Sequence, residues 1–185
     1  MQLTEKTQLT SREKIRAMVM TALGAAIISA LAPIAIPLGN FVPISLATLG
    51  VMLCGAVLGR KTGTMATLIY LILGMVGMPV IANYSSGAAI LIGPTGGYLV
   101  GYLPLAYLTG LLAEKENKTM LIAGMVIGTA VLYALGTVWF MHVTTMDLKA
   151  SLGLCVIPFL FGDTCKMITV FLLRDALRRF SPGRF

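Results

Sequence analysis

Residues 152–173, LGLCVIPFLFGDTCKMITVFLL, form an apolar run that is long enough to cross a lipid bilayer and contains two charges, Asp163 and Lys166. A spanning helix needs about 20 mostly apolar residues. Each charge inside the membrane is disfavoured by roughly 2.5 to 3.5 kcal/mol, so an ionisable residue there is a functional-site hypothesis by default. Residues three apart share one face of a helix. The run therefore predicts a membrane helix that carries a polar site.

The whole chain has the composition of an integral membrane protein. Of its 185 residues, 57% are hydrophobic and 11% are charged, and the mean hydropathy is +0.90. These values exclude an ordinary water-facing globule. The run lengths favour helices over a barrel, so we predict an all-α fold with one transmembrane domain over residues 1–185. The six predicted transmembrane helices cover residues 15–32, 44–59, 64–82, 98–112, 120–140 and 151–173.

The basic residues lie in the gaps between these runs, so the net charge of +7 predicts topology rather than nucleic-acid binding. The positive-inside rule makes the side with most Lys and Arg cytoplasmic, and both termini are then cytoplasmic. Basic residues before the first run also suggest a signal peptide, but Pro33 directly follows the possible cleavage site and we expect the helix to be retained. Twelve of the 14 basic residues fall on the predicted cytoplasmic side: Lys6, Arg12, Lys14, Arg16, Arg60, Lys61, Lys115, Lys118, Arg174, Arg178, Arg179 and Arg184.

Two predicted extracellular segments interrupt the helical pattern. Residues 33–43 contain three prolines and the pair Gly39 and Asn40, which predicts a turn-rich loop. Residues 83–97 are rich in glycine, which allows tight turns and close approach of the backbone to a ligand. Irregular backbone at membrane depth is tolerated where protein buries it or where it lines a cavity. This second segment is therefore either a flexible connector or a lid over a ligand pocket.

Small residues recur every four positions on the first and fifth predicted helices and across the end of the second. They let helices approach closely within a lipid bilayer, either inside one chain or against a partner. The three sets are Ala22, Ala26 and Ala30; Gly55, Gly59 and Gly63; and Gly124 and Gly128.

The sequence predicts no catalytic residue, metal site or cofactor. The three cysteines form no Cys-x-x-Cys pair, and His142 is the only histidine. An intramembrane serine protease using Ser85 or Ser86 with His142 would be a rival, but the Gly-x-Ser-x-Gly elbow is missing from the sequence. A purely structural subunit would leave Asp163 and Lys166 unexplained. No Gly-x-x-x-x-Gly-Lys-Ser/Thr loop is present, so energy for transport would come from a partner or a gradient.

Four stretches resemble the BioY family, the biotin-specific substrate-binding subunits of energy-coupling factor (ECF) transporters. The combination of the Gly-Pro-Thr-Gly-Gly-Tyr stretch with the Asp-x-x-Lys spacing is specific. Two positions depart from the family pattern: Ala47 stands where many members have glutamine, and Phe161 stands where a proline is expected. The stretches are VPISLATLGV at 42–51, GMVGMPV at 74–80, GPTGGY at 93–98 and FLFGDTCK at 159–166.

The resemblance implies a six-helix protein of the prokaryotic plasma membrane that captures biotin from outside. It implies docking on a transmembrane coupling subunit of the EcfT or BioN type, which links the chain to two cytoplasmic ABC-type ATPase subunits. The docking residues implied are Ala22, Ala26 and Ala30. The substrate-binding residues that we predict are Asp163, Lys166, Asn83, Gly87, Gly93, Thr95, Gly96 and Tyr98.

The chemistry of Asp163 and Lys166 suits biotin but does not select it alone. A ureido ring has two N–H donors and one carbonyl acceptor, while ionised Asp only accepts and Lys only donates. An alternative pose places the biotin carboxylate on Lys166, where Asp163 would repel it. Capture of another small vitamin, or slow uptake without a coupling module, stays open at this point.

Overall fold

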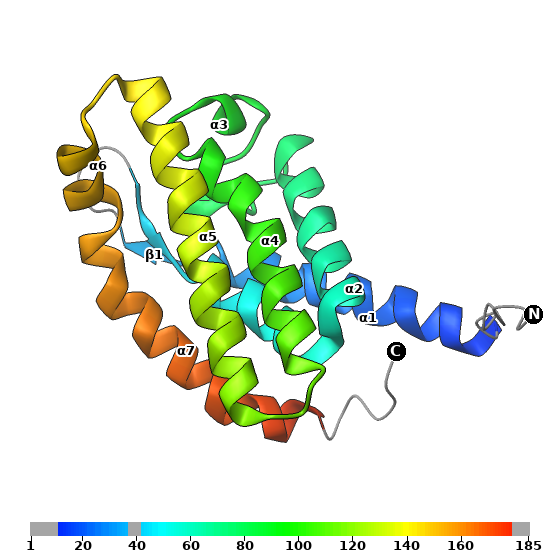
Figure 1. Ribbon diagram of the computed structural model, residues 1–185. Coiled ribbons are helices and arrows are strands. Elements are labelled where there is room, and N and C mark those ends of the chain that lie inside the picture. Colours follow the sequence, from blue (N-terminus) through cyan, green and yellow to red (C-terminus); the bar gives the residue numbers. More distant parts are fainter. Residues whose placement is uncertain (1–10, 37–41, 179–185) are drawn as a thin grey trace, which may run out of the picture.

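The computed structural model describes residues 11–36 and 42–178, which form a bundle of helices (Figure 1). Strands β1 (Ala35–Ile36) and β2 (Ile44–Ser45) pair antiparallel, with Ala35 opposite Ser45. The mainly helical prediction is confirmed, but this small sheet was not predicted, and it moves the start of the second helix from Ile44 to Ala47. The helical elements are α1 (Ser11–Leu31), α2 (Ala47–Met75), η1 (Ala82–Tyr84), α3 (Ala89–Ile92), α4 (Gly96–Ala113), α5 (Lys118–Thr144), α6 (Leu148–Cys155) and α7 (Ile157–Arg178). Five residues used above lie outside the described residues: Lys6, Gly39, Asn40, Arg179 and Arg184.

Within residues 11–36 and 42–178, four helical segments are long and apolar enough to cross a membrane. They correspond to the first, fourth, fifth and sixth predicted spans, and they are Arg12–Leu31, Gly96–Ala113, Lys118–Thr144 and Leu148–Leu177. The second and third predicted spans fall in the two halves of α2, residues 47–58 and 60–75. Each half is shorter than the roughly 20 residues of a straight span.

The helix α2 folds back on itself at Gly59, whose φ of 81° and ψ of 176° are not helical. A Cβ placed on Gly63 would lie 2.8 Å from the Cys54 carbonyl oxygen, so the two halves run close together after the turn. The Glu114 carboxylate accepts a hydrogen bond of 3.0 Å from the Arg60 backbone N–H and thereby caps the second half. The break between the second and third predicted spans is therefore a single glycine.

Replacing Gly59 by alanine should destabilise the protein by about 1 to 3 kcal/mol, because this backbone conformation is open almost only to glycine. The measurement is the thermal unfolding midpoint in detergent. Gly153→Ala is the matched control, since Gly153 lies in α6 with open space around its Cα. Equal midpoints for the two variants would contradict the assignment of Gly59 as the turn.

Two helix boundaries differ from the predicted spans. The third span was expected to reach Ala82, but α2 ends at Met75. The Met78 N–H donates to the Leu73 carbonyl and the Gly77 N–H to the Gly74 carbonyl, which is a Schellman motif, and Pro79 follows. The last predicted span, 151–173, is interrupted at Val156 and divides into α6 and α7, since Pro158 has no N–H for a continuous helix.

The turn at Gly59, the turn between α4 and α5, and the last part of α7 carry basic residues and meet at one end of the bundle. Arg60 forms an ion pair with Glu114 at 3.4 Å, and Lys118 forms one with Asp175 at 3.5 Å. The buried Arg174 guanidinium donates a 2.8 Å hydrogen bond to the Ala113 carbonyl at the end of α4. Three of the four predicted cytoplasmic groups of basic residues therefore lie at one end of the structure.

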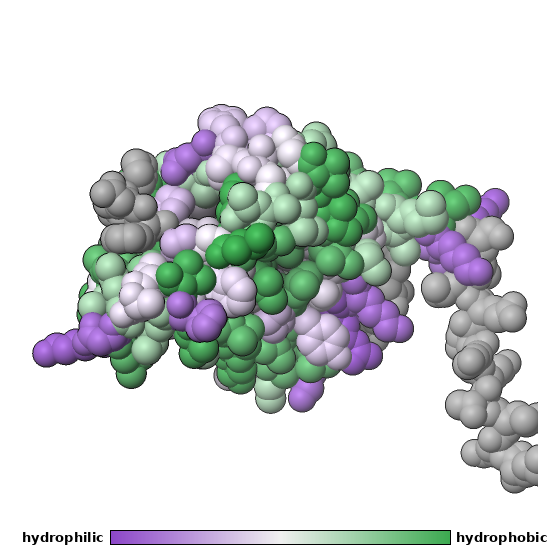
Figure 2. Space-filling view, turned by 90° about the horizontal axis from the view of Figure 1, so that it is seen from above, coloured by the Kyte–Doolittle hydropathy of each residue, from purple (hydrophilic) through white to green (hydrophobic). Residues whose placement is uncertain are grey.

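The outer surface is largely apolar, as expected for contact with lipid. Figure 2 shows hydrophobic residues over much of the surface, with hydrophilic ones in separate patches. Exposed side chains include Met18 on α1, Phe161 on α7 and Leu172 on α7. Cys54 and Cys155 are buried, whereas Cys165 is exposed.

Candidate functional site

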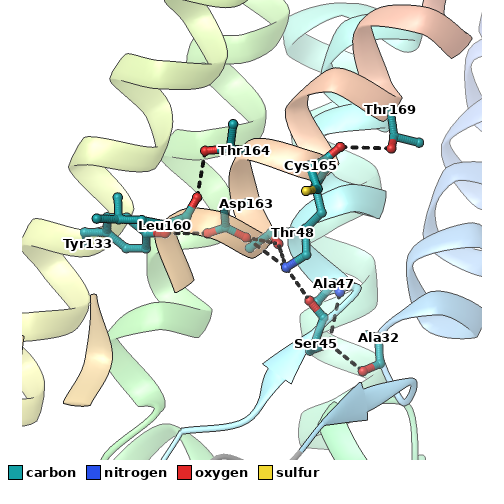
Figure 3. Close-up of polar contacts among 11 residues, drawn as sticks. Ala32, Ser45, Ala47, Thr48, Tyr133, Leu160, Asp163, Thr164, Cys165 and Thr169 are labelled. Atoms are coloured by element: carbon teal, nitrogen blue, oxygen red, sulfur yellow. Dashed lines mark hydrogen bonds and ion pairs between the residues drawn. The ribbon is translucent and has the colours of Figure 1, made fainter. Parts of the chain in front are cut away.

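Asp163 and Lys166 lie next to each other on α7 and are both buried, with 2% and 7% of their surface exposed. Lys166 Nζ lies 2.8 Å from Asp163 Oδ1. Figure 3 shows how residues from three other elements converge on the pair: Ser45 from β2, Thr48 from α2 and Tyr133 from α5. A buried ion pair is tolerated when additional hydrogen bonds satisfy both ions.

The hydrogen bonds within this cluster leave few sites for a ligand. Lys166 has three donors, and Nζ donates to Ser45 O at 2.7 Å, to Thr48 Oγ1 at 2.8 Å and to Asp163 Oδ1 at 2.8 Å. Asp163 Oδ1 also accepts from Thr48 Oγ1 at 3.1 Å. Asp163 Oδ2 accepts from the Tyr133 hydroxyl at 2.6 Å. Each carboxylate oxygen can accept two hydrogen bonds, so Oδ2 is the atom with capacity for a ligand donor.

Thr48 connects the two charges, because its hydroxyl accepts from Lys166 and donates to Asp163. Thr48→Val keeps the side-chain shape and should cost about 1 to 3 kcal/mol, since one Lys166 donor then stays unsatisfied in a buried site. The thermal unfolding midpoint without ligand measures this cost. Thr164→Val is the matched control, because the Thr164 hydroxyl is exposed and bonds only within α7, to Leu160 O. A Thr48→Val midpoint equal to that of Thr164→Val would contradict a connecting role.

Two cavities that share part of their walls lie beside the cluster. The larger, about 400 Å³, lies between the loops and α2 and α4. The smaller, about 40 Å³, is a recess bordered by Asp163, Lys166 and Tyr133. Both are lined by Ser45, Tyr98 and Tyr102, together with Val42 and Pro43. A mostly apolar chamber with a few convergent polar groups is the usual form of a small-molecule site.

The structure brings most of the predicted binding residues together. Asn83, Gly93, Thr95 and Tyr98 line the larger cavity, and Asp163 and Lys166 line the recess.

Gly87 and Gly96 are not among the residues that line either cavity. The Gly87 N–H donates to the Gly74 carbonyl at 2.8 Å and so attaches the loop to the end of α2. Gly96 begins α4, where a Cβ would collide with the Leu91 carbonyl. Their positions indicate that they shape the loop rather than contact a ligand.

Several residues of the site were not predicted from the sequence. Ser45 and Thr48 lie in the stretch 42–51 that resembles the family, but neither was predicted to belong to the site, and Tyr133 lies in none of the four stretches. Trp139 was not among the predicted site residues, yet its Nε1–H donates to the Gly93 carbonyl at 3.0 Å and holds the turn that forms one wall of the cavity. The only sequence feature that could have indicated this role is the position of Trp139 at the end of the predicted span 120–140, next to a loop.

The two departures from the family pattern lie in different environments. Ala47 is buried and lines the larger cavity, so this position supplies no polar side chain to it. Phe161 is 82% exposed on the outer face of α7, away from both cavities.

The rival protease arrangement has no support in the part of the chain that the structure describes. The Ser85 hydroxyl donates to the Ala82 carbonyl at 2.7 Å. The His142 ring neighbours Trp139, with ring centroids 6.5 Å apart. No hydrogen bond between His142 and Ser85 or Ser86 occurs among the described residues.

The alanine face of α1 is open. Ala22, Ala26 and Ala30 are exposed and line a groove of about 500 Å³ between α1 and the second half of α2.

Comparison with known proteins gives consistent matches over nearly the full length. The model of the BioY family matches residues 4–183. The biotin transporter BioY of Thermotoga maritima is 39% identical over 174 residues, which cover 94% of this chain and 99% of that protein. Biotin transporter BioY2 of Lactococcus lactis subsp. cremoris is 38% identical, over 90% of this chain and 92% of that protein. The crystal structure of the S-component for biotin from an ECF-type ABC transporter superposes with a TM-score of 0.84 at 29% identity, covering 93% of this chain and 95% of that one.

Proposed function

Since this chain belongs to the BioY family, we propose that it is a multi-pass membrane protein that takes up biotin, as the substrate-binding subunit of an ECF-type transporter. The observation that carries the proposal is the buried Asp163 and Lys166 cluster beside a cavity of about 400 Å³. The named relatives are transporters rather than enzymes.

The hydrogen bonds of the cluster favour the ureido pose. Lys166 already donates to three acceptors, so a biotin carboxylate at Nζ would have to displace one of them. Asp163 Oδ2 keeps one acceptor site and fits a ureido N–H. In this pose the edge of the ureido ring enters the recess, and the apolar rings and chain occupy the larger cavity. Asn83, Thr95 and Tyr98 line that cavity nearer the loops.

In this proposal the loop of residues 83–97 covers the larger cavity. It contributes Asn83, Gly93 and Thr95 to the wall of the cavity, and the Trp139 hydrogen bond to Gly93 holds part of it against α5. Gly87 and Gly96 belong to the proposed site through the loop shape that they allow.

We place the chain in the prokaryotic plasma membrane with six spans and both termini cytoplasmic. In this proposal the two halves of α2 are the second and third spans, and the end of the bundle that carries the ion pairs is the cytoplasmic side. The exposed groove at Ala22, Ala26 and Ala30 is the proposed docking face for the transmembrane coupling subunit, with two ABC-type ATPases supplying the energy.

A panel of small vitamins tests the substrate. Any molecule that binds the folded state raises the unfolding midpoint by mass action. We expect biotin to give the largest rise at equal concentration of ligand. A larger rise with a different vitamin would reject biotin as the substrate while leaving the fold assignment intact.

A further inference from the structure

We infer that the hydroxyl of Tyr70 contacts the bound ligand and donates a hydrogen bond to one of its oxygen atoms. This inference rests on the proposed function and adds a residue to that site. The observation behind it is a buried polar group without a partner. The Tyr70 hydroxyl has no hydrogen-bond partner among the described residues, and the residue is 0% exposed.

The position of Tyr70 distinguishes it from other buried hydroxyls. Five buried hydroxyl groups among the described residues have no hydrogen-bond partner, those of Ser29, Thr64, Tyr70, Thr109 and Thr129. Of these, only Tyr70 belongs to the lining of the larger cavity. Buried polar groups are normally hydrogen-bonded, and an exception calls for a physical reason. A ligand that fills the cavity can supply the missing partner.

Two other tyrosines around the cavities already have a hydrogen-bond partner for their hydroxyl group. Tyr133 donates to Asp163, and the Tyr98 hydroxyl lies 3.4 Å from Thr137 Oγ1. Tyr102 borders both the larger cavity and the recess, so the two cavities lie next to each other at this residue. Tyr70 therefore adds a donor in the larger cavity, where the lining is otherwise mostly apolar.

The chemistry of the site limits which ligand atoms can accept a hydrogen bond from Tyr70. Asp163 Oδ2 can only accept, so it takes a ligand N–H. Biotin then presents two kinds of acceptor oxygen, the ureido carbonyl and the carboxylate. The three donors of Lys166 are engaged within the protein, so a ligand oxygen takes its hydrogen bond from another donor of the lining, and Tyr70 supplies one whose hydroxyl has no partner.

The test is biotin titration of the full chain with Tyr70→Phe in lipid nanodiscs. The variant keeps the ring and removes only the hydroxyl, and we expect the Kd to rise roughly 3- to 10-fold. The unfolding midpoint without ligand should stay equal to or above that of the wild type, because the variant removes an unsatisfied buried group. Tyr107→Phe, at an exposed tyrosine of α4, is the control and should leave both values unchanged.

Equal or tighter biotin binding by Tyr70→Phe would overturn the inference, and so would weaker binding accompanied by a lower unfolding midpoint without ligand. Repeating the titration with 2-thiobiotin, which replaces the ureido oxygen by a weakly accepting sulfur, identifies the partner atom. Loss of the difference between wild type and variant assigns the ureido oxygen, and a persisting difference assigns the carboxylate. If the wild type itself does not bind biotin, the proposed function is rejected. This result differs from failure of the Tyr70 inference, in which the wild type binds biotin and the variant binds it equally well.

Discussion

Replacing Asp163 by leucine should abolish high-affinity biotin binding, with a rise in Kd on the order of 100-fold or more. Two effects act together. The ligand loses the charged acceptor at Oδ2, and Lys166 becomes a buried charge without its carboxylate partner. The second effect should also destabilise the fold by about 3 to 5 kcal/mol. Biotin titration and the unfolding midpoint without ligand measure the two consequences separately.

A double variant separates binding from folding. When Asp163 and Lys166 are both leucine, no unpaired charge remains, and replacement of a buried ion pair by apolar residues is often neutral or stabilising. We expect the double variant to regain thermal stability near that of the wild type and still to lack biotin binding. A double variant that binds and transports biotin normally would mean that the pair serves only to join α7 to α2.

Ala26→Trp should eliminate ATP-driven uptake, with a fall in rate of about tenfold or more, while biotin binding stays within about twofold of the wild type. Ala26 lies at the centre of the exposed alanine face of α1. A bulky ring there prevents close approach of a partner helix, but the larger cavity, where we propose that biotin binds, is lined by no residue of α1. The measurements are labelled-biotin uptake by cells that contain the coupling module, and biotin titration of the purified variant.

The control for this experiment adds the same side chain to another exposed apolar position. Leu172→Trp on α7 should leave uptake unchanged, because Leu172 is 69% exposed and lies outside the alanine groove. Copurification of the coupling subunit with each variant identifies the step that fails. An Ala26→Trp protein that retains both its partner and normal uptake would exclude this face as the docking surface.

Much of the helical architecture could be predicted because segments that cross a membrane must be apolar and must satisfy their own backbone hydrogen bonds. Apolar runs locate α1, α4 and α5 closely, and the basic residues identify turns that do meet at one end of the bundle. The second predicted span ends at residue 59, where α2 does turn. The errors came from local backbone chemistry. The Schellman motif around Gly77 and the break before Pro158 depend on single residues inside apolar sequence, where hydropathy gives no signal.

The charged residues of the site could be predicted from the sequence, whereas the residues that hydrogen-bond to them could not. Asp163 and Lys166 are recognisable because a charge in an apolar run is costly. Their partners are ordinary residues far along the chain: Thr48 is 115 residues from Asp163. A threonine or tyrosine in a helix has no sequence mark that reveals which long-range contact it makes. The role of Trp139 likewise depends on which carbonyl the fold brings to its N–H group.

The most direct test is calorimetric titration of biotin into the purified full chain in lipid nanodiscs, with retention of labelled biotin measured on the same sample. The account predicts saturable binding of one biotin per chain, which the Asp163 and Lys166 double leucine variant lacks. A cooperatively unfolding wild-type protein that gives no binding heat and retains no labelled biotin would contradict it.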